Sequence, residues 1–189
     1  MASRSTGPSA RDRILYAASE LFYADGIRAT SADRVIAEAG ITKVTFYRHF
    51  PSKSDLVVAY LALQGERERA WYASLRETGH PAGWLRTLAR GIGNASCEPG
   101  FRGCSFINAA AEFSDPNDPV RAAVAEHRAW MLGAFAEIAA EAGVRDAAAA
   151  ARLLMLLRDG AMVNGYLGDS ATVAAGLAEA FDSVIAANL

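Results

Sequence analysis

The stretch GITKVTFYRHF, residues 40–50, decides the fold expected for this chain. Its glycine can adopt a positive φ that most residues resist, and it directly follows a short helical pattern over residues 31–39. The stretch continues as a second short helix over residues 42–50, rich in hydrogen-bond donors and aromatic side chains. Two helices of about eight residues, joined by a glycine turn and packed on a preceding helix, predict a helix-turn-helix unit.

Two pairs of capping residues mark where the first two helices of this unit are expected to begin. Ser9 is followed three residues later by Asp12, which is the spacing of a capping box. Thr30 and Asp33 repeat that spacing before the second helix. We therefore expect Ser9 and Thr30 to be the N-caps.

Residues 42–50 also divide into two classes of side chain. Val44, Phe46 and Phe50 alternate with polar residues, so we expect these three to pack inward while the polar side chains face outward. The outward face of such a helix can enter the major groove of DNA, which is about 12 Å wide.

The rest of the chain also has a helical pattern. Apolar residues recur at helical spacing from about residue 9 to the C-terminus, with Gly and Pro between the segments, and strand-like alternation is nearly absent. We expect an all-α fold of about nine helices. The predicted boundaries are a flexible tail over residues 1–8, a helix-turn-helix domain over residues 9–55 and a second helical domain over residues 56–189.

The composition and the distribution of charge limit the classes of function that the chain can have. The net charge of −2 argues against a protein that coats nucleic acid without preference, but residues 1–60 carry eight Lys or Arg against six Asp or Glu. A mildly basic N-terminal third on an acidic body favours a local phosphate contact. No apolar run reaches the roughly 20 residues of a membrane span, and with only two cysteines we expect a cytoplasmic protein that contacts no membrane.

Motifs of the common enzyme classes are missing from the sequence. There is no G-x-S-x-G and no H-E-x-x-H, and the glycines of GIGNAS, residues 91–96, follow no strand. Three scattered histidines give no metal site, so we expect neither catalysis nor a cofactor. The alternative to a DNA-reading protein is a helical ligand-binding or scaffolding protein without specific DNA readout.

The stretch TSADRVIAEAGITKVTFYRHFPSKSDL, residues 30–56, resembles the N-terminal domain of the TetR family of bacterial transcriptional repressors. The shared features are the Thr-Ser opening of the second helix, the Ala-x-x-x-Gly-Ile elbow, the Tyr-x-x-Phe end of the third helix, and Ser-Lys before a helix with Leu. The resemblance implies a dimer that binds a palindromic operator in double-stranded DNA. It also implies repression that a small-molecule effector relieves by binding the second domain.

The resemblance assigns two kinds of DNA contact within the first domain. Base-edge contacts fall to Thr42, Lys43 and Thr45, with Tyr47 as a further candidate, and Thr45 has a methyl group that can meet a thymine methyl. Phosphate contacts fall to Ser31, Tyr47, Arg48, His49 and Lys53. The chain departs from the family pattern at Val44, where a small residue is usual, and at Ala32, which can be a base-reading position.

By the same resemblance, the last two helices, over residues 146–165 and 171–187, pair with their copies in a homodimer as a four-helix bundle. Apolar residues with a few polar ones in the second domain favour an effector cavity. The expected lining is Trp84, Phe106, Asn108, Glu112, Trp130, Met131, Met162 and Tyr166. Asn108 and Glu112 have the alternative role of capping neighbouring helices, and Arg158 next to Asp159 suits a dimer ion pair, a cavity or a solvated edge.

Overall fold

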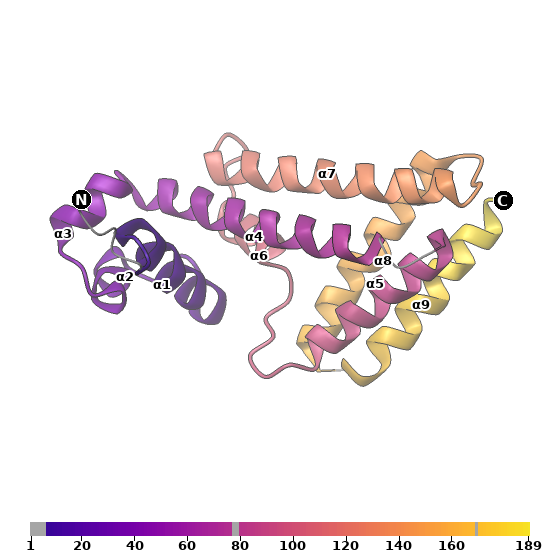
Figure 1. Ribbon diagram of the computed structural model, residues 1–189, viewed down its shortest axis with the longest axis horizontal. Helices are drawn as coiled ribbons and strands as arrows, with labels where there is room; N and C mark the ends of the chain where they lie inside the picture. The colour runs from indigo at the N-terminus through magenta and orange to yellow at the C-terminus, as the bar shows by residue number, and fades with distance from the viewer. Residues whose placement is uncertain (1–6, 77–79, 169) are drawn as a thin grey trace, which may run out of the picture.

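A computed structural model describes residues 7–76, 80–168 and 170–189, so residues 1–6 of the predicted tail lie outside the described part. Within those ranges the structure contains nine helices and no strand, which confirms the predicted all-α fold (Figure 1). The helices are α1 (Ala10–Asp25), α2 (Ala32–Ala39), α3 (Lys43–His49), α4 (Lys53–Arg76), α5 (Pro81–Ser96), α6 (Ser105–Glu112), α7 (Pro119–Glu141), α8 (Ala147–Leu167) and α9 (Ser170–Ala187).

The N-caps of α1 and α2 explain where these helices begin. Ser9 forms the predicted capping box at the start of α1. The predicted cap of α2 is wrong by one residue, because the Ser31 hydroxyl, and not that of Thr30, accepts a hydrogen bond from the N–H of Arg34. Thr30 is buried, and its hydroxyl instead donates to the carbonyl of Gly26 at 2.9 Å. The Thr30 hydroxyl therefore satisfies a backbone carbonyl at the C-terminal end of α1, and Ser31 is the residue that caps α2.

The turn between α2 and α3 has the expected helix-turn-helix geometry. Gly40 has φ +61°, in the left-handed region, and this ends α2 within a single residue. Phe46 and Phe50 are buried as predicted, whereas Val44 is exposed, so the prediction that it packs inward is wrong. Helical residues turn about 100° each, so Val44 lies about 200° around the helix from Phe46. Alternation by two is the period of a strand, and it cannot place all three residues on one helix face.

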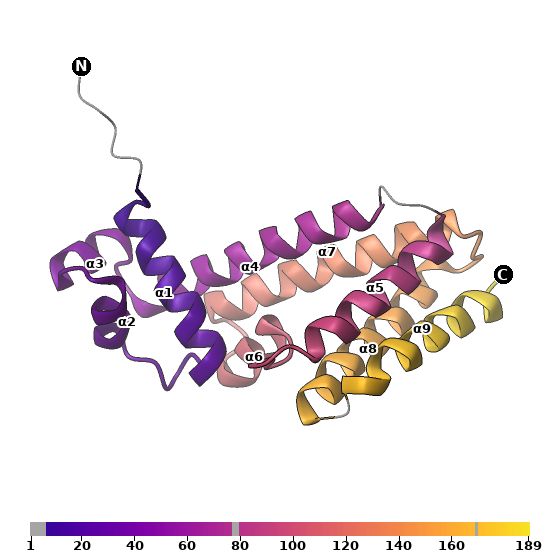
Figure 2. The same cartoon turned by 60° about the horizontal axis from the view of Figure 1, so that its bottom comes forward.

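The helices form an elongated molecule with two apolar cores (Figures 1 and 2). Helices α1–α3 lie at one end, and α5, α8 and α9 pack together at the other. One core joins α1–α3 to the first half of α4, α6 and the start of α7, and the other joins α5, α8 and α9 to the rest of α7. Helix α4 packs along α7 and runs unbroken from Lys53, so the predicted domain boundary at residue 55 falls in its first turn. None of the helices in the described ranges is long and apolar enough to cross a membrane.

Candidate DNA-binding face and effector cavity

Helix α3 has an outward face opposite its buried phenylalanines. Val44 and Arg48, one turn apart, lie near the centre of this face, and both are exposed. Tyr47 stands beside them with 43% of its surface exposed, and its ring meets the buried Phe46 edge-on at 5.1 Å. That contact holds part of the Tyr47 ring against the core, and the rest of the side chain stays exposed. The face combines hydrogen-bond donors with one apolar side chain.

The polar side chains at the start of α3 are held by intramolecular bonds. The Thr42 hydroxyl caps the helix by accepting from the N–H of Thr45 at 3.2 Å, and the two threonine hydroxyls are 3.0 Å apart. The Lys43 ammonium lies 3.4 Å from a carboxylate oxygen of Asp33, which belongs to the first turn of α2. Both groups of this ion pair are well exposed, so the pair contributes little to stability and can exchange for a DNA contact.

The residues expected to contact phosphate lie on three elements. Ser31 at the start of α2 and Arg48 on α3 are exposed, while His49 at the end of α3 is half-buried. Ser31 uses its oxygen as the α2 cap, which leaves its O–H free to donate to an anion beside the unpaired N–H groups of a helix start.

Lys53, the fifth expected phosphate contact, has a different environment. Its ammonium is half-buried and lies 3.5 Å from the carbonyl oxygen of Arg28, in the connection between α1 and α2. Burial lowers the pKa of Lys53 below its usual value, the nearby Glu112 carboxylate acts in the opposite direction, and Arg28 adds to the lowering. Helices α1–α3, residues 10–49, form the unit that carries the candidate DNA-binding face, and we call it the DNA-facing unit. Lys53 lies where this unit meets α6.

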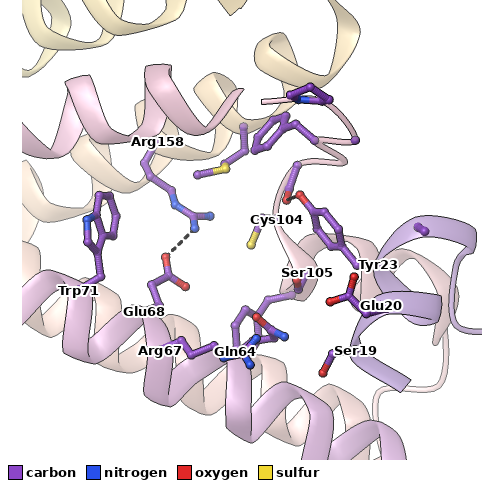
Figure 3. A pocket seen from close by; sticks show the side chains of 17 residues that line it. Ser19, Glu20, Tyr23, Gln64, Arg67, Glu68, Trp71, Cys104, Ser105 and Arg158 are labelled. Carbon is purple, nitrogen blue, oxygen red and sulfur yellow. Dashed lines mark hydrogen bonds and ion pairs between the residues drawn. The ribbon is translucent and has the colours of Figure 1, made fainter. Parts of the chain in front are cut away.

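A large cavity, with a volume of about 650 Å³, is lined by α1, α4, α6, α8 and the segment before α6 (Figure 3). Figure 3 shows Glu20 and Tyr23 of α1 on one side, Glu68 and Trp71 of α4 on another, and Arg158 of α8 reaching in between. Its full lining is Ser19, Glu20, Tyr23, Ala24, Gln64, Arg67, Glu68, Trp71, Pro99, Gly100, Phe101, Gly103, Cys104, Ser105, Phe106, Arg158 and Met162. A drug-sized molecule fits a cavity of this volume, and the lining joins apolar side chains to four charged ones, Glu20, Arg67, Glu68 and Arg158.

A buried network of charges forms one wall of this cavity. Arg158 is only 2% exposed and donates to Glu68 at 2.8 Å, so α8 is tied to α4. The other oxygen of Glu68 lies 2.9 Å from Nε2 of His127, whose ring stacks on Phe106 at 3.5 Å. Burial by itself raises the pKa of Glu68, but His127 and Arg158 together lower it below its ordinary value. Of the three roles left open for Arg158, the structure selects the cavity.

Comparison with known proteins identifies the family. The family described as "Bacterial regulatory proteins, tetR family" matches residues 14–60, and "Tetracyclin repressor-like, C-terminal domain" matches residues 82–175. The crystal structure of SCO4454, a TetR-family transcriptional regulator from Streptomyces coelicolor, is 42% identical, covers 95% of each chain and gives a TM-score of 0.90. The chain belongs to the TetR family. It is a DNA-binding transcriptional regulator with a helix-turn-helix domain.

Two curated relatives show how the family varies. The HTH-type transcriptional regulator LmrA of Bacillus subtilis is 30% identical over 124 residues, which cover 64% of this chain and 66% of LmrA. The HTH-type transcriptional activator FasR of Mycolicibacterium smegmatis is 41% identical over 51 residues, which cover 27% of this chain and 23% of FasR. The chain thus spans less than two thirds of either relative. Since FasR is named an activator, family membership alone does not fix the sign of regulation.

The eight residues expected to line the effector cavity do not come together in this TetR regulator. Phe106 and Met162 line the large cavity. Asn108, Glu112 and Tyr166 line a neighbouring cavity of about 210 Å³, while Trp84 and Trp130 line one of about 380 Å³ between α4, α5 and α7. Met131 is fully buried in the C-terminal core. The helical spacing of apolar residues could not show which of these side chains would line the same cavity, because that depends on how the helices pack.

Asn108 and Glu112 both bond to backbone groups of the connections between helices, so neither caps a neighbouring helix as their alternative role predicted. The Asn108 amide donates to the carbonyl of Arg102 just before α6, at 2.8 Å. The two carboxylate oxygens of Glu112 accept from the N–H groups of Ile27 and Arg28, at 2.9 and 2.6 Å. Glu112 therefore joins the end of α6 to the connection between α1 and α2.

A second set of hydrogen bonds joins α1 to the residues just before α6, at the other end of that helix. The Tyr23 hydroxyl of α1 donates to the carbonyl of Gly103 at 3.0 Å and accepts from the N–H of Arg102 at 2.9 Å. Tyr23 and the first residues of α6, Ser105 and Phe106, also line the large cavity, so this connection between α1 and α6 forms part of the cavity wall. Helix α6 is thus attached to the DNA-facing unit at both of its ends.

The analysis of the sequence missed two features, namely the outward position of Val44 and the pairing of Glu68 with Arg158. Val44 faces outward, and counting about 100° per helical residue would have shown this. Glu68 and Arg158 pair across 90 residues of sequence, so no local pattern signals that they meet. Only their burial in the tertiary structure reveals the pair.

Proposed function

We propose that this TetR regulator is a repressor that binds a pseudo-palindromic operator as a homodimer and is released by a small-molecule effector. The observation that carries this proposal is the large cavity, whose wall includes α1 of the DNA-facing unit and α8 of the opposite end. An effector held there touches both the part that meets DNA and a helix suited to dimerisation. The protein acts through binding without catalysis, in the cytoplasm where its DNA is.

The DNA contacts we propose follow the outward face of α3 and its surroundings. Thr42, Lys43 and Thr45 reach base edges, because the first turn of a recognition helix enters the major groove. Phosphates are held by the side chains that flank this turn, namely Ser31, Tyr47, Arg48, His49 and Lys53. One such unit offers little contact area, so two half-sites read by a dimer provide the required affinity.

The dimer interface we propose is formed by α8 and α9. Helix α8 exposes large apolar side chains that the protomer leaves uncovered, among them Leu156 at 66% and Leu167 at 75%. The others are Leu153, Val163 and Tyr166. An apolar helix face of this kind is stable in water when a second copy covers it, and two helices from each copy make a four-helix bundle.

Release follows from the position of the cavity. In one conformation of the dimer, the spacing of the two α3 helices does not fit the operator. An effector that binds this conformation more tightly than the DNA-bound conformation shifts the population toward it. The coupling free energy is a few kcal/mol at most. The route available is α6, which touches the cavity at Phe106 and holds the DNA-facing unit through Tyr23 and Glu112.

A reporter gene under the regulator's own upstream region tests this proposal. Expression of the chain should lower reporter output, and Lys43→Ala should restore it. A rise in reporter output on expression of the chain would contradict repression. In a separate footprinting experiment, the length of the protected DNA reports whether two half-sites are bound. Protection of a single half-site by a monomer would contradict the dimer.

A further inference from the structure

Val44 is the most exposed large apolar side chain in the described part of the chain, at 80%. It is the second residue of α3, within the turn that carries Lys43 and Thr45. No packing role in the protomer accounts for it. An apolar side chain this exposed needs a partner outside the chain or has no energetic role.

The position of Val44 on the helix limits what that partner is. Phe46 and Phe50 bury one face of α3, and Val44 and Arg48 lie opposite them, one turn apart. The phosphate contact proposed for Arg48 is on that face, so Val44, nearer the start of the helix, lies where a recognition helix meets base edges. Whatever covers Val44 is therefore part of the DNA that α3 faces.

Chemistry narrows the contact to a single group. An isopropyl side chain has no hydrogen atom to donate to a phosphate or to a base acceptor. Among the base edges displayed in the major groove, the apolar group is the C5 methyl of thymine. Valine also has one strongly preferred χ1 rotamer in a helix, so little side-chain entropy is lost when it is covered.

The neighbouring polar side chains reinforce this assignment. The Thr42 and Thr45 hydroxyls are 3.0 Å apart and engaged in the helix cap, and Lys43 is paired with Asp33. Within this turn, Val44 is the side chain that enters the groove with no intramolecular bond to break. We infer that Val44 contacts the C5 methyl of one thymine in each half-site and so specifies that base. The inference rests on α3 entering the major groove as proposed above.

The test begins with the operator that the full chain enriches from random double-stranded DNA. Each thymine of that operator is then replaced in turn by deoxyuridine, which removes only the methyl group and preserves base pairing. Affinities are measured for the natural chain, for Val44→Ala and for Thr45→Ser. Thr45→Ser is the matched control, because it removes one methyl group from the same helical turn. Alanine favours helices, so Val44→Ala keeps α3 intact.

For the natural chain we expect one thymine per half-site at which deoxyuridine weakens binding about fourfold, the equivalent of roughly 0.8 kcal/mol for a buried methyl group. Val44→Ala should weaken binding to the thymine operator and show no further loss at that position, whereas Thr45→Ser should retain the loss. Such non-additivity in a double-mutant cycle isolates the contact.

Three results would overturn the inference, and they differ from failure of the proposed function. One is indifference of the natural chain to every deoxyuridine. Another is a deoxyuridine-induced loss of affinity that persists unchanged in Val44→Ala. The third is a loss that disappears in Thr45→Ser and not in Val44→Ala. Enrichment of no sequence at all would refute specific DNA readout itself, and the Val44 assignment with it.

Discussion

Replacing Glu112 by glutamine should loosen the attachment of the DNA-facing unit without removing a side chain. The two Glu112 oxygens accept from the backbone N–H groups of Ile27 and Arg28, at 2.9 and 2.6 Å. Glutamine keeps one acceptor oxygen for one of these N–H groups, but its NH₂ group then faces the other backbone N–H, and two donors cannot form a hydrogen bond. Hydrogen bonds to a charged group contribute about 1.5–3 kcal/mol each, and the Arg28 side is exposed to water, so we expect a loss of about 1.5–2 kcal/mol in unfolding free energy.

Urea denaturation followed by far-UV circular dichroism measures this loss, with Glu126→Gln as the matched control. Glu126 is an exposed glutamate on α7, so its substitution should change the unfolding free energy by less than about 0.5 kcal/mol. DNA affinity and effector response should both change in Glu112→Gln, because the same carboxylate lies near Lys53. Equal stabilities for the two variants, with an unchanged effector response, would refute the role given to α6.

Further predictions concern the DNA face, the buried charges and the dimer. Lys43→Ala should lose roughly 1–3 kcal/mol of discrimination at particular base pairs, whereas Lys53→Ala should weaken binding to all duplexes alike; identical profiles would contradict this division. Glu68→Gln should destabilise the fold by roughly 3 kcal/mol at pH 7. Because the folded pKa of Glu68 lies below the ordinary 4.5, its contribution is present above that pH and is lost as the pH falls below it, so urea titrations of the two proteins should converge in acid. Leu156→Glu should convert the proposed dimer to monomers in sedimentation equilibrium while leaving helix content unchanged, and an intact dimer would place the interface elsewhere.

How far the sequence predicts this structure depends on how local each feature is. Gly40 and the apolar spacing around it act within one or two helical turns, so the helix-turn-helix and the helices that follow could be predicted. The error at Thr30 has the same scale, because two adjacent hydroxyls compete for one cap and burial of the first decides between them.

The cavity depends on contacts between distant segments. The Glu68–Arg158 pair forms only when the tertiary structure brings α4 and α8 to the same cavity, and Glu112 meets the connection before α2 across more than 80 residues. Residue types could suggest polar points for a cavity or a cap, but they could not show that Glu112 bonds to the connection between α1 and α2 and caps no helix. Which apolar residues face the opening, however, depends on the relative placement of five segments and on no pattern within any of them.

The measurement that tests the central claim most directly is a fluorescence anisotropy titration of the full chain on its selected operator. A scrambled duplex of equal length and composition runs beside it across a salt series. We predict two chains per operator and a preference over the scrambled duplex of about 10³-fold or more, with affinity for both falling as salt rises. Equal affinity for the two duplexes at every salt concentration would contradict the account.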